Sequence, residues 1–125
     1  MCMKLKNSIA SQRQSIYNLL VEEAKEYIHE HYAEQDLGIT KVCKHLHISA
    51  GYFSNIFKKE TKMTFVSYLM NVRMEAAQNM LRLSELKAFE IADQVGFADP
   101  NYFSFCFRKK FGISPKEYRS GAKTL

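Results

Sequence analysis

The chain has 125 residues and a net charge of +5. This length suits one ordinary domain, or two very small ones, and its core needs no disulfide staples. The three cysteines form no CxxC pair, and the chain shows neither a secretory signal nor an apolar run long enough to cross a membrane. These features exclude membrane-spanning and disulfide-rich secreted proteins, so we expect a cytoplasmic protein with reduced thiols.

The charge is unevenly distributed along the chain. Residues 1–36 carry four basic and six acidic side chains, whereas residues 37–125 carry fourteen basic and seven acidic ones. The second, basic part points to a polyanionic partner, although a basic pI alone favours nucleic acid only slightly over a solvated surface.

The spacing of apolar residues predicts a series of helices after a short N-terminal tail. Residues 1–14 have no clear period and are expected to be a tail or linker remnant. A helix with an acidic outer face is expected from Ser15 onward. A short helix over residues 39–46, a turn at His47 and a longer helix with Ser49 as its N-cap follow.

After a long helix this pattern starts again. The long helix is expected over residues 64–83, with a threonine N-cap and a length of roughly 30 Å. A second short helix over residues 88–95, a turn at Gly96-Phe97 and a helix opened by Asp99-Pro100 follow. Ser114-Pro115-Lys116-Glu117 has the pattern of a capping box, which predicts a short last helix. The predicted fold class is all-α.

One block of sequence occurs twice. The shared residues lie about fifty positions apart, as in Tyr52-Phe53-Ser54 and Tyr102-Phe103-Ser104. A solenoid needs three or more copies to bury its faces, so two copies indicate a paired device instead. Each copy is expected to contain a short helix, a tight turn and a longer helix.

Each longer helix carries an apolar stripe. Its helical spacing favours packing in the core over stacking on unpaired bases. The stripe consists of Tyr52, Phe53, Ile56 and Phe57 in the first copy and of Tyr102, Phe103, Cys106 and Phe107 in the second.

A second stripe follows the spacing i, i+3, i+4 and i+7 and is small, polar or basic in seven of its eight places. An ordinary solvated face explains one such stripe. Two stripes in the same register, behind the same short helix and turn, favour helices that enter the major groove of DNA. The members are Gly51, Ser54, Asn55 and Lys58 in the first copy and Asn101, Ser104, Phe105 and Arg108 in the second.

With these motifs, the chain resembles the DNA-binding domain of AraC/XylS-type transcription regulators, a bacterial family, over about residues 17–120. The motifs are Val42-Cys43 through Phe57-Lys58-Lys59-Glu60-Thr61, Arg73…Ala77…Leu81, and Val95-Gly96-Phe97 through Ser114-Pro115 to Tyr118-Arg119. The resemblance implies sequence-specific binding of double-stranded DNA and transcription regulation, with two recognition helices in successive major grooves.

The resemblance also implies a homeodomain-like domain of seven helices over residues 15–120, in which a long central helix joins two helix-turn-helix subdomains. The subdomains are expected at residues 38–60 and 87–111, the linker helix at 64–83 and the last helix at 115–120. A linker of roughly 30 Å is shorter than the ~34 Å between half-sites one helical turn apart, so either the linker pivots or the DNA bends.

Residues that contact DNA are carried over from the family by position. Where arginine is frequent in the family, this chain has Asn55 and Phe105. Asn55 can read adenine through a bidentate pair, whereas Phe105 either touches a thymine methyl group or packs against a neighbour or another domain. The base-contact candidates are Gly51, Ser54, Asn55, Asn101, Ser104 and Phe105.

Phosphate contacts are expected where the stripes continue and where the short helices open, since backbone N–H groups also meet phosphate there. Gly38 and Lys87 are poor N-caps for these short helices, but Lys87 is well placed beside a phosphate. The phosphate-contact candidates are Thr40, Lys41, Lys58, Lys87, Arg108 and Lys109.

Other functions have less support in the sequence. An enzyme is not expected, because His29 and His31 lie two residues apart on a helix and the HExxH spacing is absent. A cofactor is not expected either, and Cys43, His45 and His47 are not expected to bind a metal because Cys43 should pack inward. The main alternative is a helical protein-interaction module whose acidic first helix meets a partner. RNA polymerase and an N-terminal sensor or receiver domain are the expected protein partners, and differences between the copies predict an asymmetric site bound by a monomer.

Overall fold

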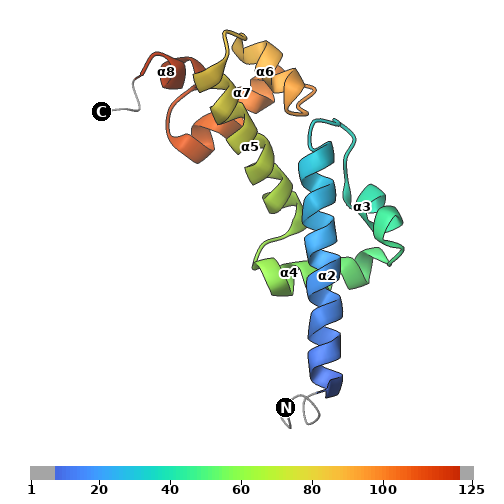
Figure 1. Cartoon of the computed structure of the whole chain (residues 1–125). Helices are drawn as coiled ribbons and strands as arrows, with labels where there is room; N and C mark the ends of the chain where they lie inside the picture. Colours follow the sequence, from blue (N-terminus) through green and yellow to red (C-terminus); the bar gives the residue numbers. More distant parts are fainter. Residues whose placement is uncertain (1–7, 122–125) are drawn as a thin grey trace. The chain divides into compact units, whose positions relative to one another are not determined.

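A computed structural model describes residues 8–121 of the protein, with side chains from Gln14 onward (Figure 1). This part of the chain is all-helical, as predicted, and contains seven helices and no strand. None of the described helices is both long and apolar enough to cross a membrane. The helices are α2 (Ser8–His31), α3 (Ile39–Leu46), α4 (Ala50–Thr61), α5 (Phe65–Leu83), α6 (Ala88–Gln94), α7 (Pro100–Phe111) and α8 (Pro115–Arg119).

The first helix begins earlier than the sequence predicted. α2 starts at Ser8 rather than at Ser15, so part of the expected tail is helical. Residues 1–7 of that tail lie outside the described part of the chain. Alanine, glutamine and arginine are good helix formers, so the helix continues through this segment without an apolar period.

The apolar stripe of α2 is buried along only part of its length. Val21, Ala24 and Ile28 are at most 3% exposed, whereas Ile16 and Leu19 are 51% and 68% exposed. The second half of α2 therefore supplies the core contacts, and the stripe predicted from spacing extends beyond the face that is covered.

The chain divides into two compact units, each of which contains one copy of the repeated block. The first unit holds α2 up to Glu30 and the segment Gly38–Tyr68. The second unit holds His31–Leu37 and the described residues from Leu69 onward. The start of α5 thus belongs to the first unit and its remainder to the second.

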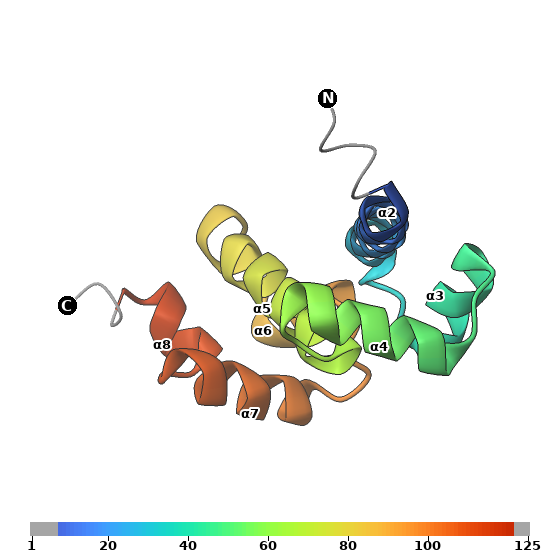
Figure 2. The ribbon, with the colours of Figure 1, turned by 90° about the horizontal axis from the view of Figure 1, so that it is seen from below.

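The first unit is built on fully buried phenylalanines of α4. Phe53 and Phe57 are 0% exposed, with ring centroids 5.1 Å apart, and Phe57 meets Tyr68 edge to face at 5.4 Å. α3 contacts α4, and Figure 2 shows both helices to one side of α2, which is seen nearly end-on. The apolar face of α4 is therefore used for packing, as its spacing predicted.

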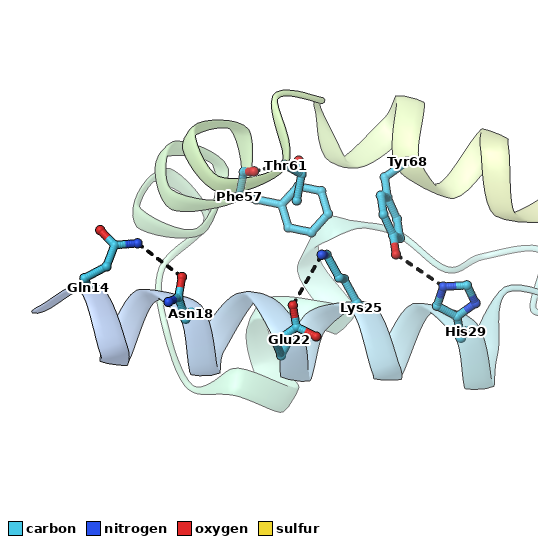
Figure 3. A network of polar contacts seen from close by, with 8 residues as sticks. All are labelled: Gln14, Asn18, Glu22, Lys25, His29, Phe57, Thr61 and Tyr68. Atoms are coloured by element: carbon cyan, nitrogen blue, oxygen red, sulfur yellow. Dashed lines mark hydrogen bonds and ion pairs between the residues drawn. The ribbon is translucent and has the colours of Figure 1, made fainter. Parts of the chain in front are cut away.

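Side-chain contacts join α2 to the other helices of the first unit. His29 Nε2 lies 3.2 Å from the Tyr68 hydroxyl oxygen at the start of α5 (Figure 3). Gln14 donates a hydrogen bond of 2.8 Å to Glu60 of α4, and Tyr27 stacks on His45 of α3 with centroids 4.4 Å apart. α2 thus holds both helices of the first helix-turn-helix.

The second unit repeats this plan with more helices. Phe103 and Phe107 of α7 are 0% exposed, and Phe107 meets Tyr118 of α8 edge to face at 5.8 Å. α7 contacts both α6 and α8. The remaining buried members of this core are Met74, Ala77, Leu81, Ile91, Ala92, Val95 and Phe97.

The predicted N-caps are confirmed. The Ser49 hydroxyl accepts a 3.2 Å hydrogen bond from Tyr52 N–H, and the Asp99 carboxylate accepts a 2.9 Å bond from Asn101 N–H. Thr64 caps α5 in the same way, accepting from Ser67 N–H at 3.1 Å. Because a side-chain oxygen at this position satisfies an orphan N–H group, these residues fix where the helices begin.

The turns of the two copies are alike, whereas the openings of their short helices differ. His47 has φ 60° and Gly96 has φ 97°, so both turns use left-handed backbone. Gly38 gives α3 no side-chain cap, as expected, whereas the backbone N–H of Lys87 donates to Glu90 at 2.8 Å. The opening of α6 is therefore better satisfied than the sequence suggested.

Two tyrosines assigned to the core lie at the surface. Tyr52 is 39% exposed and Tyr102 is 52% exposed, so the prediction of packing was wrong at these positions. Each ring leans on a neighbour at the edge of the buried face, Tyr52 on Tyr17 and Tyr102 on Phe97, with centroids 6.1 and 6.0 Å apart. Tyrosine suits such an edge because part of its ring packs against a neighbour while its polar hydroxyl tolerates a position near water.

Candidate nucleic-acid interface

The predicted polar stripe of α4 lies on the exposed side of the helix. Gly51, Ser54, Asn55 and Lys58 are all exposed, opposite the buried phenylalanine face. A Cβ atom on Gly51 would meet no atom within 4 Å, so the surface there is open. α4 thus presents a smooth, short-chain surface that ends in a cation, which suits close approach to the edges of bases.

The stripe of α7 is similar, with one residue less accessible. Asn101, Phe105 and Arg108 are exposed, and Ser104 is half-buried. Phe105 is 52% exposed, and its ring contacts are with Tyr102 and Lys109 of the same helix. The second stripe therefore combines polar groups with an aromatic surface that the first stripe lacks.

The phosphate-contact candidates also lie at the surface. Thr40 and Lys87 stand at the openings of α3 and α6 and are exposed, whereas Lys41 is half-buried. Lys109 places its Nζ 5.9 Å from the ring centroid of Phe105. Lys58 lies on α4 at the end of the first polar stripe. Arg108 and Lys109 lie on α7 at the end of the second.

A half-buried arginine holds the turn of the second helix-turn-helix. Arg73 Nε donates to the carbonyl oxygen of Tyr32 at 2.9 Å, and Nη2 donates to that of Glu34 at 2.8 Å. The guanidinium carbon lies 5.9 Å from the ring centroid of Phe97. Burial lowers the pKa of Arg73, but a guanidinium keeps its proton at neutral pH. This cation therefore fastens residues just after α2 beside the turn at Gly96.

A second arginine fastens the segment that leads into α6. Arg119 Nε donates to Leu81 O at 3.1 Å, Nη2 donates to Ser84 O at 2.9 Å, and Nη1 donates to Leu86 O. Leu81 lies in the last turn of α5, and Ser84 and Leu86 lie between α5 and Lys87, the N-cap residue of α6. Arg119 thus sets the path of the backbone that presents Lys87.

Three residues that shape this surface were not predicted to do so from the sequence. Arg73 and Arg119 were noted only as parts of family motifs, and Tyr102 was placed in the core. The signal for Arg73 was present, because it interrupts the apolar spacing of the long helix between buried Val72 and Met74. The acceptors of both arginines are backbone carbonyls, which sequence patterns do not mark.

The Tyr102 hydroxyl lies near the thiol of Cys106, one helical turn further along α7. This neighbouring thiol raises the pKa of Tyr102, because it favours the protonated phenol over the phenolate.

Within the described residues, no group of three histidine, cysteine or acidic side chains is arranged to hold a metal ion. Cys43 is buried with its sulfur 3.8 Å from Ser49 O, and His45 stacks on Tyr27. His47 forms the left-handed C-cap of α3. The spacing of these three residues therefore reflects three different local roles.

Comparison with known proteins gives consistent results. Residues 42–121 match the protein family described as "Helix-turn-helix domain". The Msm operon regulatory protein of Streptococcus mutans serotype c is 35% identical over 99 residues, which cover 79% of this chain and 35% of that protein. The chain spans little more than a third of the length of the first regulatory proteins that it matches.

Solved structures match over most of both chains. The C-terminal domain of AraT, a response regulator from Geobacillus stearothermophilus, is 38% identical with a TM-score of 0.79, and the match covers 81% of this chain and 84% of that one. The DNA-binding domain of AdpA, a global transcriptional factor solved in complex with a target DNA, is 26% identical with a TM-score of 0.77. That match covers 83% of this chain and 93% of the AdpA domain.

Proposed function

The chain belongs to the DNA-binding domains of AraC/XylS-type transcription regulators, and we propose that α4 and α7 are the two helices with which it reads DNA. Binding of double-stranded DNA and regulation of transcription are the functions of this family, which is not a class of enzymes. Each helix enters a major groove, and the two grooves are successive ones on the same side of the duplex.

One observation carries this assignment to α4 and α7. In both helices the predicted stripe, apart from half-buried Ser104, is exposed on the side opposite phenylalanines that are 0% exposed. The buried face fixes the helix in its unit, and the short side chains of Gly51, Ser54 and Asn55 allow α4 to approach base edges closely. The base contacts are made by Gly51, Ser54, Asn55, Asn101, Ser104 and Phe105.

The cations beside each stripe supply the contacts that do not depend on sequence. Lys58 and Arg108 continue the stripes, Lys41, Lys87 and Lys109 meet phosphates near the same helices, and Thr40 adds a neutral contact. About five charged contacts give a slope of log affinity against log salt of roughly −4 to −5. A slope near zero would count against DNA as the ligand.

The differences between the two stripes set the form of the binding site. Gly51 stands where the second copy has Asn101, and Asn55 stands where it has Phe105. A monomer therefore reads an asymmetric site with two half-sites about 10 base pairs apart. Half-site centres lie about 34 Å apart and a linker of roughly 30 Å is shorter, so either the linker pivots or the DNA bends. Gel mobility of circularly permuted fragments detects bending.

We infer the protein partners by analogy with the relatives. One similar structure is the C-terminal domain of a response regulator, and another relative is an operon regulatory protein. By analogy, this domain works in the bacterial cytoplasm as the output of a receiver or sensor domain and acts on RNA polymerase at the promoter. Its effect on transcription then depends on the signal that the other domain receives.

The deciding experiment is selection of bound sites from random duplex DNA. Enrichment of two different half-sites about 10 base pairs apart supports the assignment of both helices. Enrichment of a single half-site would show that one helix reads DNA alone. If no sequence is enriched and the protein binds no duplex, the proposed readout is wrong.

A further inference from the structure

The exposed face of α7 carries two large aromatic rings side by side. Tyr102 and Phe105 are each 52% exposed, and their rings stack with centroids 6.4 Å apart and planes 20° apart. Burying aromatic rings is favourable, so two large rings that stay exposed leave unfavourable apolar surface in contact with water. Such a surface indicates a binding partner with apolar groups.

These rings are held in place by their own surroundings. The ring of Tyr102 lies against the ring of Phe97, which is 5% exposed, with centroids 6.0 Å apart. Phe105 lies between Tyr102 on one turn and Lys109 on the next, and the Nζ of Lys109 is 5.9 Å from its centroid. A side chain ordered before binding loses less entropy when a ligand arrives.

The first copy has no such device. Asn55 occupies the position that corresponds to Phe105, and Tyr52 is 39% exposed with Tyr17 of α2 against it. The two helix-turn-helix units share their buried faces but differ at this point of their exposed faces. The aromatic pair is therefore a feature of one reading helix and not of the fold.

The surroundings favour DNA over a protein as the partner. The last turns of α7 carry Arg108, Lys109 and Lys110, all exposed, so the apolar rings lie next to three cations. In the major groove the base edges offer hydrogen-bonding groups and one apolar group, the C5-methyl group of thymine. Phe105 stays 52% exposed beside Tyr102 and Lys109, so part of its ring is accessible to such a methyl group.

We propose that Phe105 reads thymine methyl groups in the half-site of α7, and that Tyr102 is the positioning residue that holds the Phe105 ring. The proposal rests on the proposed function, since it assumes that α7 enters the major groove. It predicts that this half-site contains one or two thymines at fixed positions, and that the half-site of α4 has no such dependence on methyl groups.

The test removes the methyl group and nothing else. In a duplex obtained by selection, each thymine of the α7 half-site is replaced in turn by deoxyuracil, and affinity is measured by fluorescence anisotropy. Wild-type protein should lose about fourfold per contacted methyl group, the equivalent of about 0.8 kcal/mol. Phe105→Ala should bind thymine and uracil duplexes equally, whereas Asn55→Ala, the matched control in the other helix, should still discriminate.

The positioning role of Tyr102 is tested separately. Tyr102→Ala should reduce discrimination between thymine and uracil without changing the salt slope, and Tyr102→Phe, which keeps the stacked ring, should restore it. Circular dichroism confirms folding, which substitutions at exposed positions should not disturb. Equal discrimination in wild type and Tyr102→Ala would overturn this part of the proposal.

Failure of the inference and failure of the proposed function give different results. If wild-type protein binds the selected duplex but tolerates uracil at every position, DNA binding stands and methyl readout is wrong. The same conclusion follows if Phe105→Ala keeps wild-type affinity and discrimination, which would make the rings a surface for a protein partner. If no duplex is bound, the proposed function itself fails.

Discussion

A Cβ atom on Gly96 would lie 2.5 Å from the carbonyl oxygen of Tyr32, and that oxygen already accepts a hydrogen bond from Arg73. The turn between α6 and α7 therefore touches the backbone just after α2 with no room for a side chain. Gly96 also has φ 97°, a region that favours glycine. Two independent restrictions meet at one residue.

Replacing this glycine should be far more costly than replacing another one with similar backbone. Gly96→Ala is expected to cost about 3–4 kcal/mol, because backbone strain adds to steric overlap with Tyr32 and Arg73. Gly112→Ala is the matched control, since Gly112 has φ 84° but nothing within 4 Å of a Cβ position. It should cost about 1–2 kcal/mol. Urea denaturation measures both, and equal costs would contradict the role of close contact.

Arg119 should contribute to stability through its three carbonyl acceptors. Arg119→Ala is expected to cost about 1–3 kcal/mol, since hydrogen bonds to a charged group are lost and the end of α5 is left unsatisfied. Arg119→Lys should recover only part of this loss, because an ammonium lacks the planar fork. Lys116→Ala on the same helix is the control. Thermal denaturation measures the stability of each variant. An Arg119→Ala protein as stable as the wild type would show that these hydrogen bonds do not stabilise the fold.

The capping box of α8 predicts a dependence of stability on pH. The Ser114 N–H donates to Glu117 Oε1 at 2.8 Å, and this bond lowers the pKa of Glu117 below its ordinary value of 4.5. A carboxylate with a lowered pKa in the folded state stabilises the protein above pH 4.5, and the effect is lost as the pH falls through the folded-state pKa.

Glu117→Gln keeps the acceptor oxygen but removes the charge, so it isolates this effect. Its melting temperature should be lower than that of the wild type at pH 7, and the two curves should converge in acid. Glu75→Gln, at an exposed position of α5, controls for the loss of one negative charge. A gap between wild type and Glu117→Gln that persists at the lowest pH would mean that charge is not the cause.

Asn55 and Asn101 separate DNA readout from a protein-interaction module. Both are exposed, so Asn55→Ala and Asn101→Ala should leave stability within about 0.5 kcal/mol. Each should weaken binding to the selected site by about 1–3 kcal/mol without changing the salt slope. Competition binding against nonspecific duplex tests this. Unchanged DNA affinity in both variants would favour the protein-interaction module.

Local chemistry explains why much of the fold was predictable. Ser49, Asp99 and Ser114 cap helices through atoms only two or three residues away, so the sequence contains the whole interaction. The exposed stripes followed from the same local spacing. The start of α2 was missed because its polar beginning has no apolar period, although nothing in it prevents a helix.

Contacts between distant segments were not predictable. Tyr102 and Phe103 are adjacent in sequence, yet one is 52% exposed and the other 0%. Their spacing marks a broad apolar face, but the edge of that face is decided by where neighbours such as Phe97 lie. Likewise, Arg73 differs from a surface arginine only in its acceptors, which are backbone carbonyls about forty residues earlier in the chain.

The segment His31–Leu37 belongs to the second unit, which limits where the protein can be truncated or joined to parts of a relative. The acceptors of Arg73 lie in this segment, which comes before the first helix-turn-helix in the gene. A fragment that begins after Tyr68 would therefore carry a half-buried guanidinium stripped of both carbonyls. Each compact unit consists of two separate segments of the chain. DNA specificity should therefore be transferable between relatives by grafting the exposed residues of α4 or α7. Exchanging the N-terminal or C-terminal half of the chain should fail.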